Sequence, residues 1–194
     1  MSDHLVESYD KQLELINSNL VKMGGLVEQQ VKDSLKALDD KDTEFAEEIL
    51  KKDDKIDNLE KEIYALAYKI IAMRQPMAND LRTVVSALSI ANDLERMGDH
   101  ATNVAKRVAN VKVSMPSQSI SKIVQMGDDV QNMIKNVLDA FIKMSEKKAI
   151  TVWDSDIDID ETYLSIYREL LQMMADNPET CLLYTSPSPR DQRG

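Results

Sequence analysis

Acidic residues spaced four apart are the side chains of this sequence best suited to chemistry. Three of these pairs are candidate cation ligands: Asp53 with Asp57, Glu95 with Asp99, and Asp156 with Asp160. Residues four apart share one face of an α-helix, where like charges destabilise the helix by roughly 0.2–0.5 kcal/mol per pair. A hard divalent or trivalent cation prefers oxygen-only sites and would offset the repulsion if two pairs met across neighbouring helices. The pairs therefore indicate either a metal site or a solvated acidic face whose charge Arg96 and Lys106 partly neutralise.

Long helices are expected to position the first two pairs. Apolar residues recurring every three or four positions predict helices from about Leu5 to Leu38, Glu44 to Met73 and Met77 to Ala109. The stretch DDKDT, residues 39–43, interrupts the pattern and offers Asp or Thr as an N-cap. Pro76 ends the second helix because proline disfavours helical geometry in the preceding residue. Three such helices joined by short turns predict an antiparallel bundle.

The third of these helices changes character along its length. Its first half carries an apolar stripe of Leu81, Val84, Val85 and Leu88, which continues as Asn92, Glu95, Asp99 and Asn103. The opposite side stays apolar at Ile90, Leu94, Met97, Ala101, Val104 and Val108. The second half therefore has a polar side and a core-facing side. His100 points about 100° away from the carboxylates and is expected to face solvent or a partner.

The chain also repeats itself at a constant offset of 103 residues without gaps. Matching positions include Gly24 with Gly127, Leu35 with Leu138, Asp57 with Asp160, and Tyr64 with Tyr167. We therefore expect a first three-helix unit in residues 1–113 and a linker in residues 114–119. Residues 120–180 then form an incomplete second unit of two helices, 120–144 and 149–175. The predicted fold class is all-α, with tandem antiparallel three-helix bundles of which the second lacks its last helix.

The end of the chain, residues 181–194, departs from this pattern. Residues 181–191, CLLYTSPSPRD, resemble the conceptual translation of a transposase-type adapter used in preparing sequencing libraries. We expect the natural protein to continue past Thr180 and residues 181–194 to be an unstructured artefact. The second unit would then expose part of an apolar stripe, and we expect the chain to self-associate or to fold only partly there. The stripe consists of Val130, Ile134, Leu138, Phe141, Ile166 and Leu170.

The composition and the absence of certain motifs argue against several classes of protein. With 24 basic and 34 acidic residues the net charge is −10, which argues against nucleic acid or an anionic membrane as the main partner. No apolar run approaches the roughly 20 residues of a membrane span. The N-terminus lacks the pattern of a secretory signal. Nothing resembles a phosphate-binding glycine-rich loop. A cytoplasmic protein without direct membrane insertion is the expectation.

Three segments resemble the PhoU family of phosphate-signalling proteins. RQPMANDLRTVVSALSIANDLERMGDHATNVAKR, residues 74–107, resembles the family's third-helix signature. DDKIDNLEKEIY, residues 53–64, resembles its second-helix motif, and MMADNPET, residues 173–180, the lead-in to its second signature helix. The resemblance covers residues 1–180 and includes the duplication, while the second signature itself is absent after Thr180.

The resemblance implies a non-enzymatic cytoplasmic regulator of phosphate uptake that represses the phosphate-starvation response. It implies two partners: the ATPase subunit of a phosphate ABC transporter (PstB-like) and a phosphate sensor histidine kinase (PhoR-like). A homo-oligomer is also expected. It further implies a multinuclear metal site, with iron, manganese, magnesium or zinc held by the acidic pairs: Asp53 with Asp57, Glu95 with Asp99, and Asp156 with Asp160.

Helical bundles also serve two other functions. A ferritin-like carboxylate oxidase needs Glu-x-x-His on two helices, and neither His4 nor His100 has Glu three residues before it. The second is a metal-binding or purely structural helical-bundle adaptor unrelated to phosphate signalling, which stays open on the sequence alone.

Overall fold

A computed structural model describes residues 2–51, 54–110 and 116–176, with side chains from Tyr9 onward. The described residues form six α-helices and their connecting turns. These helices are α1 (Ser2–Asp40), α2 (Thr43–Leu50), α3 (Asp54–Arg74), α4 (Ala78–Asn110), α5 (Ser117–Ile142) and α6 (Glu146–Asp176). The predicted all-α class is therefore confirmed. Within these ranges, no helix combines the length and apolar character needed to cross a bilayer.

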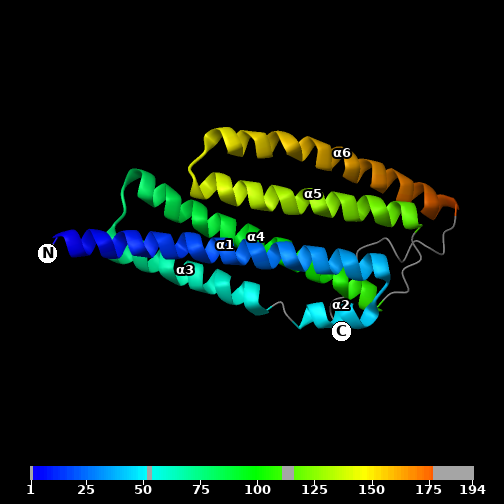
Figure 1. Cartoon of the computed structure of the whole chain (residues 1–194), viewed down its shortest axis with the longest axis horizontal. Helices are drawn as coiled ribbons and strands as arrows, with labels where there is room; N and C mark the ends of the chain where they lie inside the picture. The colour runs from blue at the N-terminus through cyan, green and yellow to red at the C-terminus, as the bar shows by residue number, and fades with distance from the viewer. Residues whose placement is uncertain (1, 52–53, 111–115, 177–194) are drawn as a thin grey trace.

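The helices pack side by side along one long axis (Figure 1). Helix α1 packs against α3 and α4 to form an antiparallel three-helix bundle, and α2 packs on the end of α4. Helix α5 lies against the other side of α1, and α6 packs on α5. One apolar core joins α1, α3, α4 and α5 and includes Ile16, Leu20, Met23, Val27, Ile63, Ile70, Val84, Ile134 and Leu138.

The internal repeat is visible in the turns that follow α1 and α5. Lys41 and Met144, which are repeat-equivalent, both adopt the left-handed conformation, with φ of 54° and 48°. One residue later, the amide of Asp42 donates to Ala37 O at 3.0 Å and the amide of Ser145 donates to Ala140 O at 2.8 Å. These donors and acceptors are again 103 residues apart. The same turn closes both helical hairpins.

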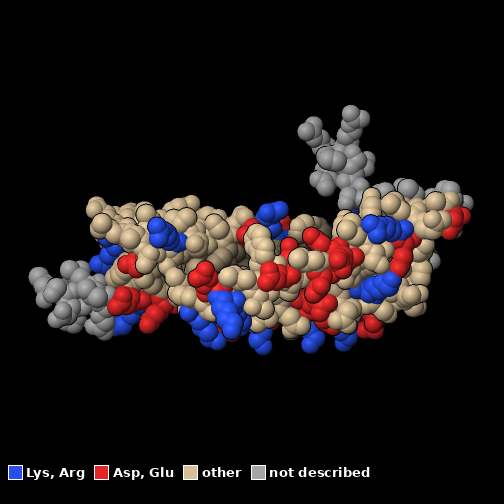
Figure 2. All heavy atoms as spheres, turned by 90° about the horizontal axis from the view of Figure 1, so that it is seen from above, with Lys and Arg blue, Asp and Glu red and all other residues tan. Residues whose placement is uncertain are grey.

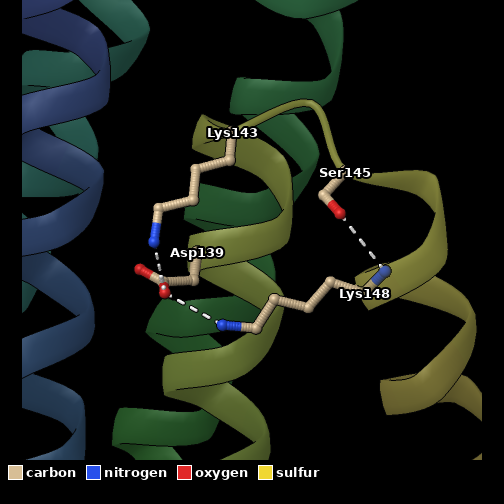
Figure 3. A network of polar contacts seen from close by, with 4 residues as sticks. All are labelled: Asp139, Lys143, Ser145 and Lys148. Carbon is tan, nitrogen blue, oxygen red and sulfur yellow. Dashed lines mark hydrogen bonds and ion pairs between the residues drawn. The ribbon is translucent and has the colours of Figure 1, made fainter.

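Helix capping after each turn follows the same plan. The Asp42 carboxylate accepts from the amide of Phe45 at 2.9 Å, which confirms an aspartate as the N-cap of the second predicted helix. The Ser145 hydroxyl accepts from the equivalent amide, that of Lys148, at 3.3 Å (Figure 3). Beside it, the ammonium groups of Lys143 and Lys148 donate to the Asp139 carboxylate at 3.0 and 2.9 Å. These ion pairs tie the start of α6 to the end of α5.

Two predicted helix boundaries need correction. The helix expected over 44–73 is divided, because α2 ends at Leu50 and α3 begins at Asp54. Ile49 and Ile56 are both buried and seven residues apart, so the apolar stripe stays in phase across the break. Periodicity could not reveal it. Helix α5 begins at Ser117, so residues 117–119, expected to be linker, are helical.

The apolar stripe of the second unit, predicted to be exposed in part, has three buried and three half-buried members. Ile134, Leu138 and Ile166 are buried, and the other members are half-buried, because α5 packs against α1. The exposed apolar side chains lie mainly along α6 instead. They are Ile150, Trp153, Ile157, Tyr163, Leu164, Tyr167 and Leu171.

Candidate functional site

Gly98 on α4 lies at a close approach of α4 to α3 and α1. A Cβ atom placed there would lie 3.0 Å from Ile56 Cδ1 on α3 and 3.8 Å from Gln30 Oε1 on α1. A 3.0 Å gap is tighter than van der Waals contact, so this position favours glycine. Three helices therefore meet at Gly98.

This contact involves helix segments that carry three of the predicted metal ligands: Asp57 on α3, and Glu95 and Asp99 on α4. Asp57, half-buried, follows Ile56 on α3, while exposed Asp99 follows Gly98 on α4. Glu95 is half-buried, one turn before Asp99. Asp53 lies outside the described residues. The carboxylates of this region have the donor chemistry that a hard cation requires.

The described residues of this region do not form a full set of metal ligands. Across residues 9–51, 54–110 and 116–176, no three His, Cys, Asp or Glu side chains gather closely enough to hold an ion. His100 is exposed, as expected, and stands apart from the buried side of α4. A metal at this contact would need Asp53 or a rearrangement of the exposed Asp99 side chain.

A buried polar contact fixes how α4 lies on α1. The Gln30 amide donates to the Thr102 hydroxyl at 2.5 Å and approaches Gly98 O at 3.5 Å. Both Gln30 and Thr102 are buried. Buried polar groups are costly when unpaired, so this bond favours one register of the signature helix α4.

In the second unit, the surface equivalent to the one that α4 covers is open. No helix equivalent to α4 lies on it in the described residues. Ile159 and Met133, the equivalents of Ile56 and Gln30, line an open groove of about 380 Å³ between α5 and α6. Asp156 and Asp160 are both exposed on α6. In the described part of the chain, these two carboxylates are not joined by an equivalent of Glu95 and Asp99.

Acidic side chains dominate the middle of the outer face of α5 and α6. Figure 2 shows many carboxylates close together near the middle of this face, with basic side chains around them and along the lower edge. The sequence DSDIDIDE, residues 154–161, supplies five of these acids on α6. Their density fits the negative net charge of the whole chain.

A second groove, absent from the sequence-based expectations, lies between α3 and α4. It encloses about 570 Å³ and is lined by Tyr64, Tyr68, Val85, Leu88, Ser89, Asn92 and Asp93. The two tyrosine rings meet edge to face, with centroids 5.8 Å apart. Burial raises the pKa of Tyr64, and the negative charges of Glu60, Asp93 and Glu95 raise it further. The change from apolar to polar residues along α4 was the available sequence signal for this groove.

Comparison with known proteins decides the family. The family model described as the PhoU domain matches twice, at residues 20–108 and 123–185. The chain belongs to the PhoU family. The two matches reproduce the internal repeat and contain the acidic pairs of both PhoU units.

Relatives support the assignment over most of the chain. A protein of Caulobacter vibrioides (strain NA1000 / CB15N), named phosphate-specific transport system accessory protein PhoU homolog, is 39% identical over 181 residues, covering 93% of this chain and 79% of that protein. A Clostridium acetobutylicum protein of the same name is 39% identical over 170 residues, covering 87% of this chain and 78% of its own length.

Solved structures agree in fold. The crystal structure of PhoU from Pseudomonas aeruginosa matches with a TM-score of 0.83 at 35% identity, covering 90% of this chain and 84% of that one. The phosphate transport system regulatory protein PhoU from Streptococcus pneumoniae matches with a TM-score of 0.79 at 32% identity, covering 87% and 80%. The helical arrangement is therefore that of PhoU proteins.

Proposed function

We propose that this chain is a cytoplasmic, non-enzymatic regulator of phosphate transport. The observation that carries the proposal is the match to phosphate-specific transport system accessory proteins over about nine-tenths of the chain. Both PhoU units take part in that match, so the resemblance is not confined to one helix or motif. The name of these relatives describes an accessory role rather than a catalytic one.

In the proposed mechanism the chain bridges two proteins of the phosphate system. One is the ATPase subunit of a phosphate ABC transporter, and the other is the sensor histidine kinase of the starvation response. When phosphate is plentiful, the bridge favours the inactive state of the kinase. The rigid packing of α1 between α4 and α5 supports this role, because a firm body can hold two partners at a fixed separation.

A complementation experiment tests the proposal. The chain is expressed in a bacterium that lacks its own PhoU-family protein and carries a phosphate-starvation reporter. At high phosphate the reporter is expected to fall from its constitutive level toward that of the parent strain. An immunoblot confirms equal expression of the chain and the native protein. A reporter that stays constitutive despite normal expression would refute the regulatory role.

A second candidate function is metal binding by the acidic pairs, as an adaptor with or without a phosphate role. The approach of α3 and α4 at Gly98, with carboxylates on both sides of it, supports this candidate. Iron, manganese, magnesium or zinc would be held by Asp57, Glu95 and Asp99 together with Asp53. Carboxylates are suitable ligands for these hard or borderline cations.

Metal analysis of the purified chain tests this second candidate. The double variant Glu95→Ala with Asp99→Ala should lose most of the bound metal. Asp10→Ala with Glu14→Ala is the matched control, because these two acids are also four apart and are exposed on α1. Equal metal content in both variants would remove the metal assignment.

A further inference from the structure

The groove between α3 and α4 has an apolar part and a polar part. Tyr64, Tyr68, Val85 and Leu88 line the apolar part, and Ser89, Asn92 and Asp93 line the polar part. Tyr68 is 58% exposed and Val85 is nearly half exposed, so an aromatic ring and an aliphatic side chain are accessible to a partner.

One end of the groove carries a negative charge. Asp93 lies at its polar end, and its side chain is 60% exposed. The charged groups that act on the neighbouring Tyr64 hydroxyl are all acidic: Glu60, Asp93 and Glu95. Arg96 approaches Asp93 only to 3.9 Å, and both side chains are largely exposed, so this pair neutralises little of the charge.

Aromatic faces beside a carboxylate are complementary to a guanidinium group. The ring quadrupole attracts a cation placed over its face, and arginine stacks on aromatic rings better than lysine does. Arginine and aromatic residues are also the side chains most often found at the energetic centre of protein interfaces. The acidic end of the groove would fix the direction in which such a side chain lies.

We infer that this groove docks an amphipathic helix of a partner protein, with an apolar side chain on Val85 and Leu88 and an arginine between Tyr68 and Asp93. The distance from Val85 to Asp93 is about 12 Å along α4. Roughly seven residues of a docked helix cover that length, which places its apolar residue and its arginine on one face. An open groove between two parallel ridges suits a helix better than an enclosed pocket would.

This surface belongs to the first unit alone in the described chain. Tyr167 on α6 is the repeat-equivalent of Tyr64, and it stacks on Tyr163 with ring centroids 6.1 Å apart. In the described residues, α6 has no helix like α4 packed beside it to form the second wall. Tyr167 is therefore a suitable control: an exposed tyrosine outside the groove. The inference goes beyond the regulatory role and does not depend on phosphate.

A peptide titration tests the inference with the full chain. The probe is a blocked helical peptide of about 15 residues, long enough to form a helix in contact with protein. It carries one leucine and, seven residues later, one arginine on an alanine and glutamine background. We expect saturable binding that weakens about fivefold when the arginine of the peptide becomes glutamine. Amide NMR shifts should map to α3 and α4.

Variants of the chain provide the decisive comparison. Tyr68→Ala and Asp93→Lys should each weaken binding about fivefold or more, because they remove the ring and reverse the charge. Tyr167→Ala and Asp154→Lys, which change the same residue types at exposed positions on α6, should bind as the parent chain does. Circular dichroism confirms that all four variants are folded.

Three outcomes would overturn the inference. The first is that the peptide fails to bind, and the second is that it binds the Tyr68 and Asp93 variants as tightly as the parent chain. The third is that N-acetyl-arginine methylamide alone binds as tightly as the peptide, because the groove would then take a small cation rather than a helix.

Discussion

Gly24 on α1 lies directly against Leu138 on α5, and the repeat-equivalent residues, Gly127 and Leu35, make the same contact in the reverse sense. A Cβ atom added to either glycine would overlap a leucine methyl carbon. Reciprocal contact of this kind is the property of a two-fold interface, in which residue i contacts j and j contacts i. The two PhoU units therefore pack across an internal pseudo-two-fold axis between α1 and α5.

Glycine substitutions test this packing. Gly127→Ala should be less stable than Gly25→Ala by about 1–3 kcal/mol, the usual cost of overpacking a core. Both changes gain the same helix propensity, about 1 kcal/mol, which therefore cancels in the comparison. Gly25 is the matched control because an added Cβ there meets nothing within 4 Å. Urea denaturation of both variants measures the difference.

A double variant identifies the clash partner. Leu35→Ala removes the methyl groups that an alanine at position 127 would meet. Combined with Gly127→Ala, it should show a coupling energy of about 0.5–3 kcal/mol, because the second change relieves the first. Strict additivity, or equal stability of the Gly25 and Gly127 variants, would contradict the proposed close approach.

The buried bond between Gln30 and Thr102 gives a second prediction. Thr102→Val removes the acceptor of the Gln30 amide and should lower the free energy of unfolding by about 1–3 kcal/mol. Thr83→Val is the control, because the Thr83 hydroxyl donates only to Asn79 O at an exposed position. That change is expected to cost less than about 0.5 kcal/mol. Thermal or urea unfolding that ranks the two variants equally would argue against a structural role for the buried pair.

Sequence reasoning gave the helical hairpins but not the arrangement of the two units. The spacing of apolar residues, together with Asp42 and Pro76, located the ends of the first two predicted helices to within a few residues. Asp42 caps the helix that begins at Thr43, and Pro76 follows the helix that ends at Arg74. A repeat shows that two units are alike and does not show which faces they share. The contact between α1 and α5 depends on how a leucine of each helix fits against a glycine of the other. The sequence signal for it was that Gly24 and Gly127 occupy matching positions in the two copies.

The residues of the candidate site belong to different helices. Spacing of four predicts Glu95 and Asp99 on one face of α4, and the structure shows that α4 approaches α3 closely where Gly98 meets Ile56. The groove at Tyr64 and Tyr68 depends on residues of two helices, so a pattern read along one helix does not reveal it. Asp53 lies outside the described residues, and the metal assignment stays a prediction.

Asp139 gives a prediction on pH. Hydrogen bonds from Lys148 and Lys143, and their positive charges, lower the pKa of Asp139 from 3.8 to about 2. A carboxyl group with a lowered folded-state pKa adds stability above its unfolded pKa and loses it as the pH falls through the folded value. The stability difference between the parent chain and Asp139→Asn should therefore be full above about pH 5, shrink as the pH falls, and be mostly lost by about pH 2.

The urea concentration at half-unfolding, measured across that pH range for the parent chain and for Asp139→Asn, gives the effect of Asp139. High salt should reduce the difference at neutral pH, because these groups are partly exposed and screening weakens their attraction. A difference that persists unchanged below pH 2 would show that Asp139 acts through packing rather than charge.

The exposed face of α6 predicts self-association. Trp153, the sole tryptophan of the chain, is 81% exposed. Its fluorescence should shift to the blue as protein concentration rises, because association moves the indole out of water. Trp153→Lys should weaken association by roughly tenfold or more, given about 1.5–3 kcal/mol for burying one large apolar side chain.

Met77→Lys provides the control for that experiment. Met77 is also 81% exposed but precedes α4, away from α6. Sedimentation velocity should show parental association for the Met77 variant and a shift toward monomer for the Trp153 variant. A parent chain that stays monomeric at every concentration, with unchanged Trp153 emission, would contradict the prediction.

The measurement that bears most directly on the proposed function is equilibrium binding of the full chain to the isolated transporter ATPase subunit and to the cytoplasmic part of the sensor kinase. Saturable binding to both is expected, and Asp10→Ala with Glu14→Ala should leave it unchanged. Circular dichroism confirms that the chain is helical in the same samples. A folded chain that binds neither protein would contradict the role of a direct bridge in phosphate regulation.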